Sequence, residues 1–165
     1  MSRTRSMKFP NTLSDLDTLF DKIQRAISNR SLTSGGLAIK GAGLALAKTV
    51  NTVYFRIDGS MYSKAAADMA AFVGTVTNAK FNVFVHTVNA AGTLATRMGV
   101  EAATLGGVAF PTIPDGEVVI GVTVINPTGT GNFVGGTTVL DDVTVVPNAA
   151  YISVNFAFAP GIETL

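Results

Sequence analysis

Apolar and polar residues alternate along much of the chain after Thr52, which is the pattern of β-strands buried on one face. Val53, Phe55 and Ile57 form the first alternating run, and Asp58-Gly59 follows as a hairpin signal. Further strands are predicted within residues 61–65, 81–88, 93–97, 103–110, 118–125, 133–140, 143–146 and 151–158. No helix of crossover length separates them. The pattern predicts a mainly β fold, an antiparallel β-sandwich or barrel of short strands.

One amphipathic helix is predicted before the β region, over residues 12–29. Its apolar positions recur at three- and four-residue spacing and form a single stripe: Leu13, Leu16, Phe20, Ile23 and Ile27. A stripe of this length is too short for a coiled coil that is stable by itself. We therefore expect it to pack either on the β-sheet of its own subunit or on the same helix of neighbouring subunits.

A short basic arm precedes this helix and carries Arg3, Arg5 and Lys8. It is either a frayed terminus or a segment that orders on a partner. The arm and the helix together form a predicted N-terminal unit, residues 1–33, that serves as an anchor or an oligomerisation element. Residues 34–165 form the predicted β-rich domain, which starts with a Gly- and Ala-rich stretch of one or two short strands.

Composition adds a reason to expect neighbours around this domain. The 165 residues are 47% hydrophobic and only 14% charged. A chain with so few charges is expected to have much of its surface covered by other subunits. The charges are also separated along the chain, since all 12 basic residues lie between Arg3 and Arg97, whereas six acidic residues follow Met98. This separation is either chance or a sign that the basic part of one subunit faces an acidic surface of a neighbour.

Catalytic residue patterns are sparse. His86 is the only histidine and lies within a predicted strand, where a surface position or a satisfied hydrogen-bonding role is expected. The chain has no cysteine, and one histidine offers too few ligands for a zinc site. Asp141-Asp142 is interpreted as an acidic turn, with a bound hard cation as the alternative. We therefore expect no enzymatic activity, no metal and no cofactor.

The sequence also limits the classes of partner. No apolar run approaches the roughly 18 residues that a membrane helix needs, and synthesis in a cytoplasm is expected. Three basic residues in the arm are a weak patch for nucleic acid, and no recognition motif follows them. The segment 126–132, Asn-Pro-Thr-Gly-Thr-Gly-Asn, is expected to be an exposed loop that turns the chain or contacts a partner. Asn126, Pro127 and Phe133 are its candidate contact residues.

Two segments resemble small auxiliary virion proteins of tailed bacteriophages. The first is Tyr54–Asp68, with the sequence YFRIDGSMYSKAAAD, and the second is Pro114–Asp142. The second segment matters most: it combines Pro-Asp-Gly, a valine-rich strand, Asn-Pro, a short loop, Phe-Val-Gly-Gly-Thr-Thr and Leu-Asp-Asp. The resemblance implies a β-rich, often trimeric protein that decorates or cements a capsid, or forms the base of a head fibre.

Under this interpretation the chain is a structural component of a virion, and its partner is the major capsid protein or another virion protein. The expected contact residues are the arm, the apolar stripe of the helix and the loop at 126–133. Two other functions stay open on the residues alone. One is a tail-fibre or receptor-binding module, and the other is the main coat protein of a small virus whose basic arm faces nucleic acid.

Overall fold

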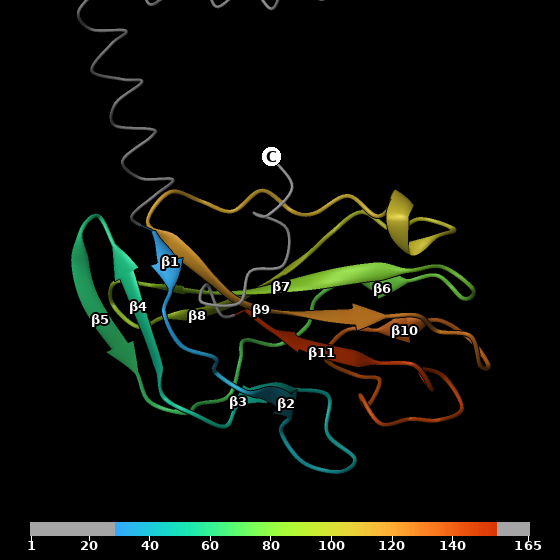
Figure 1. Cartoon of the computed structure of the whole chain (residues 1–165). Helices are drawn as coiled ribbons and strands as arrows, with labels where there is room; N and C mark the ends of the chain where they lie inside the picture. The colour runs from blue at the N-terminus through green and yellow to red at the C-terminus, as the bar shows by residue number, and fades with distance from the viewer. Residues whose placement is uncertain (1–28, 155–165) are drawn as a thin grey trace, which may run out of the picture.

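The computed structural model describes residues 29–154, in which the chain forms eleven β-strands and one short 3₁₀ helix (Figure 1). The elements are β1 (Arg30–Ser31), β2 (Leu37–Ile39), β3 (Ala47–Thr49), β4 (Val53–Ile57), β5 (Ser60–Lys64), β6 (Thr75–Val76), β7 (Asn82–Asn89), β8 (Leu94–Met98), η1 (Leu105–Gly107), β9 (Glu117–Ile125), β10 (Phe133–Val134) and β11 (Ala150–Ser153). The prediction of a mainly β fold is confirmed. No α-helix occurs among these residues, and the helix predicted over 12–29 lies outside them except for Asn29.

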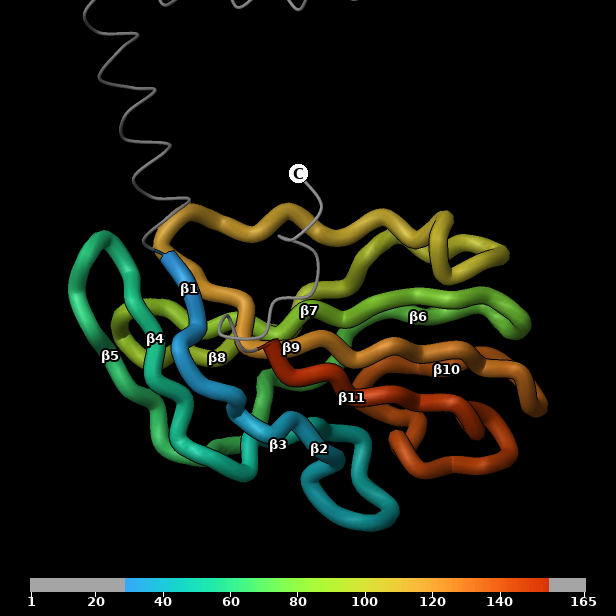
Figure 2. The backbone as a smooth tube through the Cα atoms, viewed as in Figure 1, coloured from blue at the N-terminus to red at the C-terminus, as the bar shows by residue number. Residues whose placement is uncertain are grey.

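All of the paired strands are antiparallel, as the absence of crossover helices predicts. The largest sheet has the order β11-β9-β7-β8, and a second sheet has the order β1-β4-β5. Two small ribbons, β2-β3 and β10-β6, complete the described structure. Strands β1 and β4 also lie beside β9, and the two larger sheets thereby enclose a shared interior in a sandwich-like arrangement (Figure 2).

The β4–β5 hairpin follows directly from its sequence. Val53, Phe55 and Ile57 are almost fully buried, whereas the alternate position Tyr54 is exposed. Asp58 and Gly59 form the two-residue turn with φ values of 49° and 83°, the left-handed conformations that such a turn requires. The predicted hairpin is therefore confirmed.

Strand β7 is one of the two inner strands of the largest sheet and is buried along nearly its whole length. Its register with β9 shifts between His86 and Thr87, whose partners are Gly121 and Val119. Ile120 is thus the extra residue of a β-bulge, and its side chain is 1% exposed. The bulge shifts the alternation of β9 by one residue, so that Val118 and Ile120 before the shift and Ile125 after it all belong to the core.

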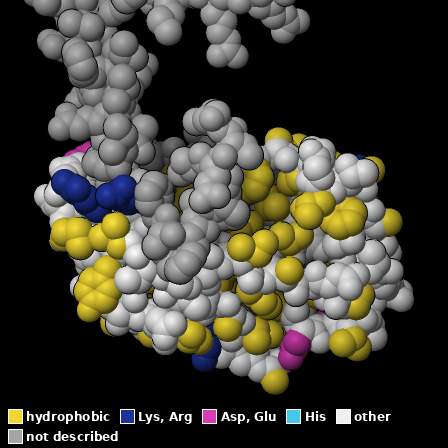
Figure 3. Space-filling view, viewed as in Figure 1, with side chains coloured by type: hydrophobic (Ala, Val, Ile, Leu, Met, Phe, Trp, Pro, Cys, Tyr) yellow, Lys and Arg dark blue, Asp and Glu magenta, His cyan; other side chains and the backbone are white. Residues whose placement is uncertain are grey.

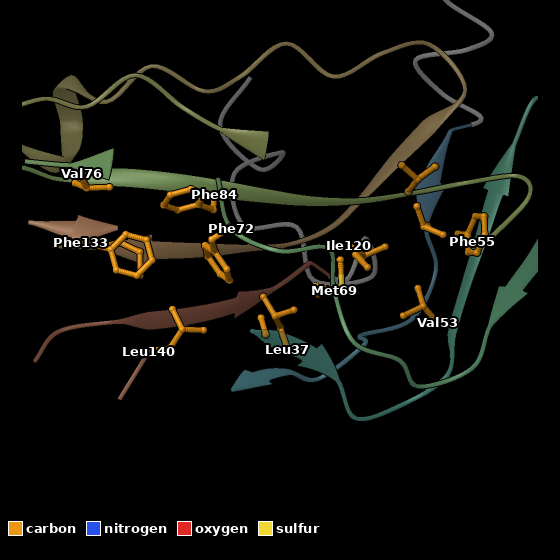
Figure 4. Close-up of a cluster of buried hydrophobic side chains, with 14 of the residues drawn as sticks. Leu37, Val53, Phe55, Met69, Phe72, Val76, Phe84, Ile120, Phe133 and Leu140 are labelled. Atoms are coloured by element: carbon orange, nitrogen blue, oxygen red, sulfur yellow. The ribbon is translucent and has the colours of Figure 1, made fainter. Parts of the chain in front are cut away.

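The core fills the space between the sheets and the two ribbons (Figure 4). Its aromatic centre consists of Phe72, Phe84 and Phe133, whose rings meet edge to face with centroids 4.8 to 6.0 Å apart. Aliphatic residues from β4 and β9 extend the core toward the β4–β5 hairpin, where Phe55 stacks on Tyr62. The core thus joins residues that are far apart in the sequence.

Two predicted strands are wrong. Residues 143–146 form turns, because Asp142 accepts hydrogen bonds through its carbonyl from the backbone N–H groups of Val145 and Val146. Residues 103–110 form no ladder of their own: they contain η1 and reach the sheet only through an isolated bridge between Val100 and Ala109. Both segments are short apolar runs, which periodicity alone does not assign to strands.

Candidate functional site

The predicted contact residues of the N-terminal unit lie outside the described residues. They are Arg3, Arg5, Lys8, Leu13, Leu16, Phe20, Ile23 and Ile27. Strand β1 starts at Arg30 and pairs with Arg56 and Phe55 of β4, so pairing within the β domain begins ahead of residue 34.

The loop between β9 and β10 differs from its prediction, because its candidate contact residues are buried. Asn126 is 9% exposed, Phe133 is 0% exposed, and Pro127 is also buried. The prediction that these three side chains are exposed is wrong: Phe133 belongs to the aromatic core, and Asn126 and Pro127 are buried directly after β9. Only the tip, residues 128–132, is open to a partner.

This tip is held by hydrogen bonds from three other segments. Asn78 donates from its side chain to the Gly129 carbonyl at 2.9 Å, and its backbone N–H donates to the Asn132 side chain at 2.9 Å. The Thr130 N–H donates to the Thr144 carbonyl at 2.5 Å. Asn148 donates to the Thr128 hydroxyl at 3.1 Å. These bonds fix the loop in one conformation, which favours presentation of a defined surface over free movement.

His86 lies in the middle of β7, fully buried, and both ring nitrogens are satisfied. The Thr96 hydroxyl donates to the Ala70 carbonyl at 2.7 Å, so its oxygen is left to accept from His86 Nδ1–H at 3.0 Å. The other nitrogen, Nε2, then accepts from the Thr123 hydroxyl at 2.8 Å. The expectation of a satisfied strand histidine is confirmed, and this network fixes the neutral Nδ1–H tautomer.

Burial lowers the pKa of His86 from 6.5 to about 4. The ring also has an aromatic neighbour, since the Phe72 ring meets it edge to face with centroids 5.5 Å apart. The imidazole is therefore neutral at physiological pH and enclosed by hydroxyls and an aromatic ring. This environment suits a structural link between β7, β8 and β9.

The carboxylate of Glu117 has several hydrogen-bond donors around it. It accepts from the Thr87 hydroxyl at 2.5 Å and from Arg97 Nη2 and Nε at 2.5 and 3.3 Å. Burial by itself would raise the pKa of this group, but the hydrogen bonds from Thr87 and Arg97 and the charge of Arg97 hold the pKa of Glu117 below its ordinary value. The carboxylate thus stays ionised and joins three strands.

Asp141 and Asp142 both act within turns. Both carboxylate oxygens of Asp141 lie 3.0 to 3.1 Å from the Gly43 N–H, which ties this turn to the loop between β2 and β3. Asp142 accepts from the side chain and the backbone N–H of Thr144 at 2.6 and 2.8 Å, and these bonds hold the pKa of Asp142 below its ordinary value. The interpretation of an acidic turn is confirmed, and the alternative of a bound cation stays a prediction.

Large apolar side chains are exposed at several places on the surface. Eleven of them among the described residues are 42% to 76% exposed: Leu44, Val50, Tyr54, Met61, Val73, Val100, Leu105, Phe110, Val134, Val143 and Ile152. Figure 3 shows apolar side chains spread across the visible face, with charged side chains in only a few places. In soluble proteins, contiguous apolar patches mark interaction sites, whereas apolar side chains exposed one by one are ordinary.

The outer face of the β4–β5 hairpin belongs to this surface and was missed by sequence reasoning. Tyr54 is 49% exposed and Met61 is 61% exposed, and Arg56 lies directly opposite Met61 in the ladder. The alternation that buries Val53 and Phe55 places these residues on the solvent side. The sequence does contain a signal for this surface: Tyr54 and Met61 are large apolar residues at positions where the alternation predicts exposure to solvent.

The described residues contain no group of three or more His, Asp or Glu side chains that could hold a metal ion. Within residues 29–154 there is also no helix of the length and apolarity that crossing a membrane requires. Comparison of the chain with known protein families, with curated proteins and with solved structures finds no match.

Proposed function

We propose that this chain is a structural virion protein of a tailed bacteriophage, which decorates and cements the capsid through protein–protein contacts. It acts as a trimer on the outside of the shell, and its partner is the major capsid protein. The proposal assigns it no catalytic role and no cofactor. It rests first on the resemblance of Tyr54–Asp68 and Pro114–Asp142 to auxiliary virion proteins.

The structural observation that carries the proposal is the exposed apolar surface. Eleven large apolar side chains are more than 40% exposed over residues 29–154, and they lie on several different elements. Contacts on several sides are what a subunit between capsomers needs. Burial of apolar area contributes about 25 cal/mol per Å², so an interface of about 2,000 Å² has a large gross hydrophobic term in each copy.

The hydrogen-bonded loop tip at 128–132 also supports a binding role. Its conformation is fixed before any contact, so little conformational entropy is lost when it is covered. The separation of basic and acidic residues along the chain supports contacts between unlike surfaces of neighbouring subunits.

The direct test is binding of the purified chain to capsids assembled from the major capsid protein of the same phage. We expect symmetric density on the outer shell in electron cryomicroscopy and a higher temperature of capsid rupture. A single ring of density at the tail, or no binding to the shell, would overturn the proposal. Assembly of the purified chain alone into closed particles would instead identify a coat protein.

The trimer has a separate test in the mass of the full chain by light scattering. A trimeric mass is expected, and a monomeric mass at all concentrations would overturn it. A variant with charges in the predicted helix stripe, Leu16→Glu with Phe20→Glu, then locates the contact. Loss of the trimer in this variant places the contact in the predicted helix, whereas its retention places the contact in the β domain.

A further inference from the structure

Strand β5 is an open edge of the β1-β4-β5 sheet. Its backbone ladder pairs with β4 alone, and Figure 1 shows it as the outermost strand, with its other side facing away from the body of the molecule. Edge strand β11 of the largest sheet, in contrast, lies against β2, where the Leu37 N–H donates to the Ser153 hydroxyl at 2.6 Å. An open edge is a ready surface for another strand.

The register shows which residues of β5 have outward backbone groups. Tyr54 uses its backbone on the β1 side of the sheet: its carbonyl accepts from Leu32 N–H at 2.8 Å, and its N–H donates to the Thr33 hydroxyl at 2.9 Å. Tyr54 and its partner Ser63 are therefore a pair without mutual hydrogen bonds, and so are Arg56 and Met61. Hence the N–H and C=O groups of Met61 and Ser63 point out of the sheet edge.

We propose that β5 pairs with β5 of a second copy of this chain, antiparallel and about a two-fold axis at Tyr62. In this register Met61 of each copy forms backbone hydrogen bonds with Ser63 of the other copy. All of the outward N–H and C=O groups of these two residues are then satisfied. A two-fold axis at Met61 or at Ser63 satisfies only one such pair, because the remaining residue would face a position beyond the strand ends at Ser60 and Lys64. The strand is thus most complementary to itself in a single register.

The side chains agree with this pairing. Tyr62 lies on the inner face, partly buried against the core, and stacks on Phe55 with centroids 5.7 Å apart and planes at 20°. Pairing about Tyr62 would place the two tyrosines opposite each other and extend the aromatic row across the new strand pair. Lys64 would lie opposite Ser60 of the second copy, so no like charges meet within the paired strands.

This contact relates two copies, so it is additional to the proposed trimer and does not rest on the proposed virion function. If the basic unit is a trimer, the β5 contact would link trimers, and if it is a monomer, the contact would produce a dimer. Pairing of the first two units doubles the mass of the basic unit, and we refer to this as the mass-doubling step. A trimer carries three copies of β5, so further pairing of trimers then produces larger assemblies.

The first test uses two double variants of the full chain. M61K/S63K places lysines opposite each other at both hydrogen-bonded pairs, and M61K/S63E places lysine opposite glutamate there. Met61 is 61% exposed and Ser63 is also exposed, so both variants are tolerated by the folded subunit. By analytical ultracentrifugation, we expect M61K/S63K to raise the dissociation constant of the mass-doubling step about tenfold.

The matched variant M61K/S63E is expected to retain the mass-doubling step at low salt, because its charges are complementary. Equal association of the two variants, or absence of the step in the unmodified chain, would overturn the proposal. Loss of the step in both variants would also contradict it, since the opposed pairs of M61K/S63E attract.

The second test uses the absence of cysteine from the chain. Cysteine introduced by Tyr62→Cys lies on the proposed axis, where facing Cα atoms of such a pair are about 4.5 Å apart, a separation that a disulfide spans. We expect rapid disulfide dimers on mild oxidation. The control is Tyr54→Cys. The native Tyr54 side chain is 49% exposed, but it lies on β4, away from the proposed axis. Equal cross-linking at the two positions, or none at residue 62, would overturn the register.

Discussion

Arg97 of β8 and Glu117 of β9 form a two-point ion pair across the intervening strand β7, with Arg97 Nη2 2.5 Å from Glu117 Oε1. The side chains are 32% and 16% exposed, and the hydroxyl of Thr87 on β7 also donates to this carboxylate. One acidic group therefore joins three neighbouring strands. Strands β8 and β9 are separated in the chain by the long segment that contains η1, so this ion pair helps to hold the sheet together on both sides of β7.

Replacement of the carboxylate, Glu117→Gln, is expected to lower the free energy of unfolding at pH 7 by about 2 kcal/mol, as loss of a charge-assisted hydrogen bond does. Urea denaturation measures this loss. The more exposed pair Lys40–Asp68, at 37% and 47%, supplies the control. Its variant Lys40→Gln is expected to cost less than about 1 kcal/mol.

The same pair predicts a pH dependence. The folded-state pKa of Glu117 is lowered, so its contribution is complete above the unfolded value of 4.5 and is lost as the pH falls through the folded value. The difference in stability between the unmodified chain and Glu117→Gln should therefore shrink below pH 4.5. A difference that is constant from pH 7 to pH 3 would contradict a role for the charge.

His86 predicts a second pH dependence with its own window. Burial lowers the pKa of His86 to about 4 in the folded chain. Below pH 6.5 the unfolded chain therefore binds more protons at this residue than the folded chain does. The free energy of unfolding should be unaffected above pH 6.5 and should fall between pH 6.5 and 4, by about 3 kcal/mol in total. Denaturant titrations at pH 7, 6 and 5 measure the slope.

The control is His86→Gln, which removes the titrating group. This variant is expected to be less stable at pH 7, because Thr96 and Thr123 lose their shared ring, but its stability should be nearly constant from pH 7 to 5. Equal slopes for the two chains would assign the pH dependence to other groups and remove His86 as its cause.

The sequence predicts those elements whose burial follows a local period. The inward face of β4 follows from Val53, Phe55 and Ile57, and the turn follows from Asp58-Gly59. The hairpin can therefore be predicted from a few residues. The satisfied state of His86 is also readable, since a lone histidine within an apolar strand needs polar neighbours. The identity of its partners, Thr96 and Thr123, cannot be predicted from the local sequence, because strand pairing between distant segments brings these residues together.

The loop residues show where local pattern fails. Asn126, Pro127 and Phe133 stand among turn residues, and that composition predicts exposure. The structure buries Phe133 because two-residue pairing of β10 with β6 turns it into the core beside Phe72 and Phe84. Such a contact depends on long-range packing, so composition does not reveal it. The exposed Tyr54 and Met61, in contrast, were available from alternation.

Gly129 predicts a sharp steric effect at the loop tip. A Cβ atom there would overlap the backbone carbonyl of Thr144, which approaches closely because it accepts the Thr130 N–H. Gly129→Ala should therefore displace the loop and lower the free energy of unfolding by about 1–3 kcal/mol, as overpacking against rigid atoms does. Thermal denaturation measures this change.

Gly106 in η1 is the matched control, because no heavy atom lies within 4 Å of the Cβ that alanine would add. Gly106→Ala is expected to change stability by less than about 0.5 kcal/mol. If both variants melt like the unmodified chain, the close approach of residue 129 to Thr144 is wrong. That result would also weaken the view of residues 128–132 as a fixed surface.

Phe133 and Val134 are adjacent on β10, but their replacement by alanine is expected to affect stability very differently. Phe133 is 0% exposed and packs against Phe72 and Phe84, whereas Val134 is 42% exposed. Phe133→Ala leaves a cavity in the aromatic core and is expected to cost about 3–5 kcal/mol of unfolding free energy. Val134→Ala is expected to cost less than about 1 kcal/mol, because a large part of its surface is already in water.

Binding measurements on the same two variants separate stability from contact. With the capsid assay of the proposed function, Val134→Ala weakens binding if β10 is part of the contact, while its stability is nearly unchanged. Phe133→Ala lowers stability whether or not β10 contacts a partner. If Phe133→Ala were as stable as the unmodified chain and bound the capsid more weakly, Phe133 would be a contact residue, and its place in the core would be wrong.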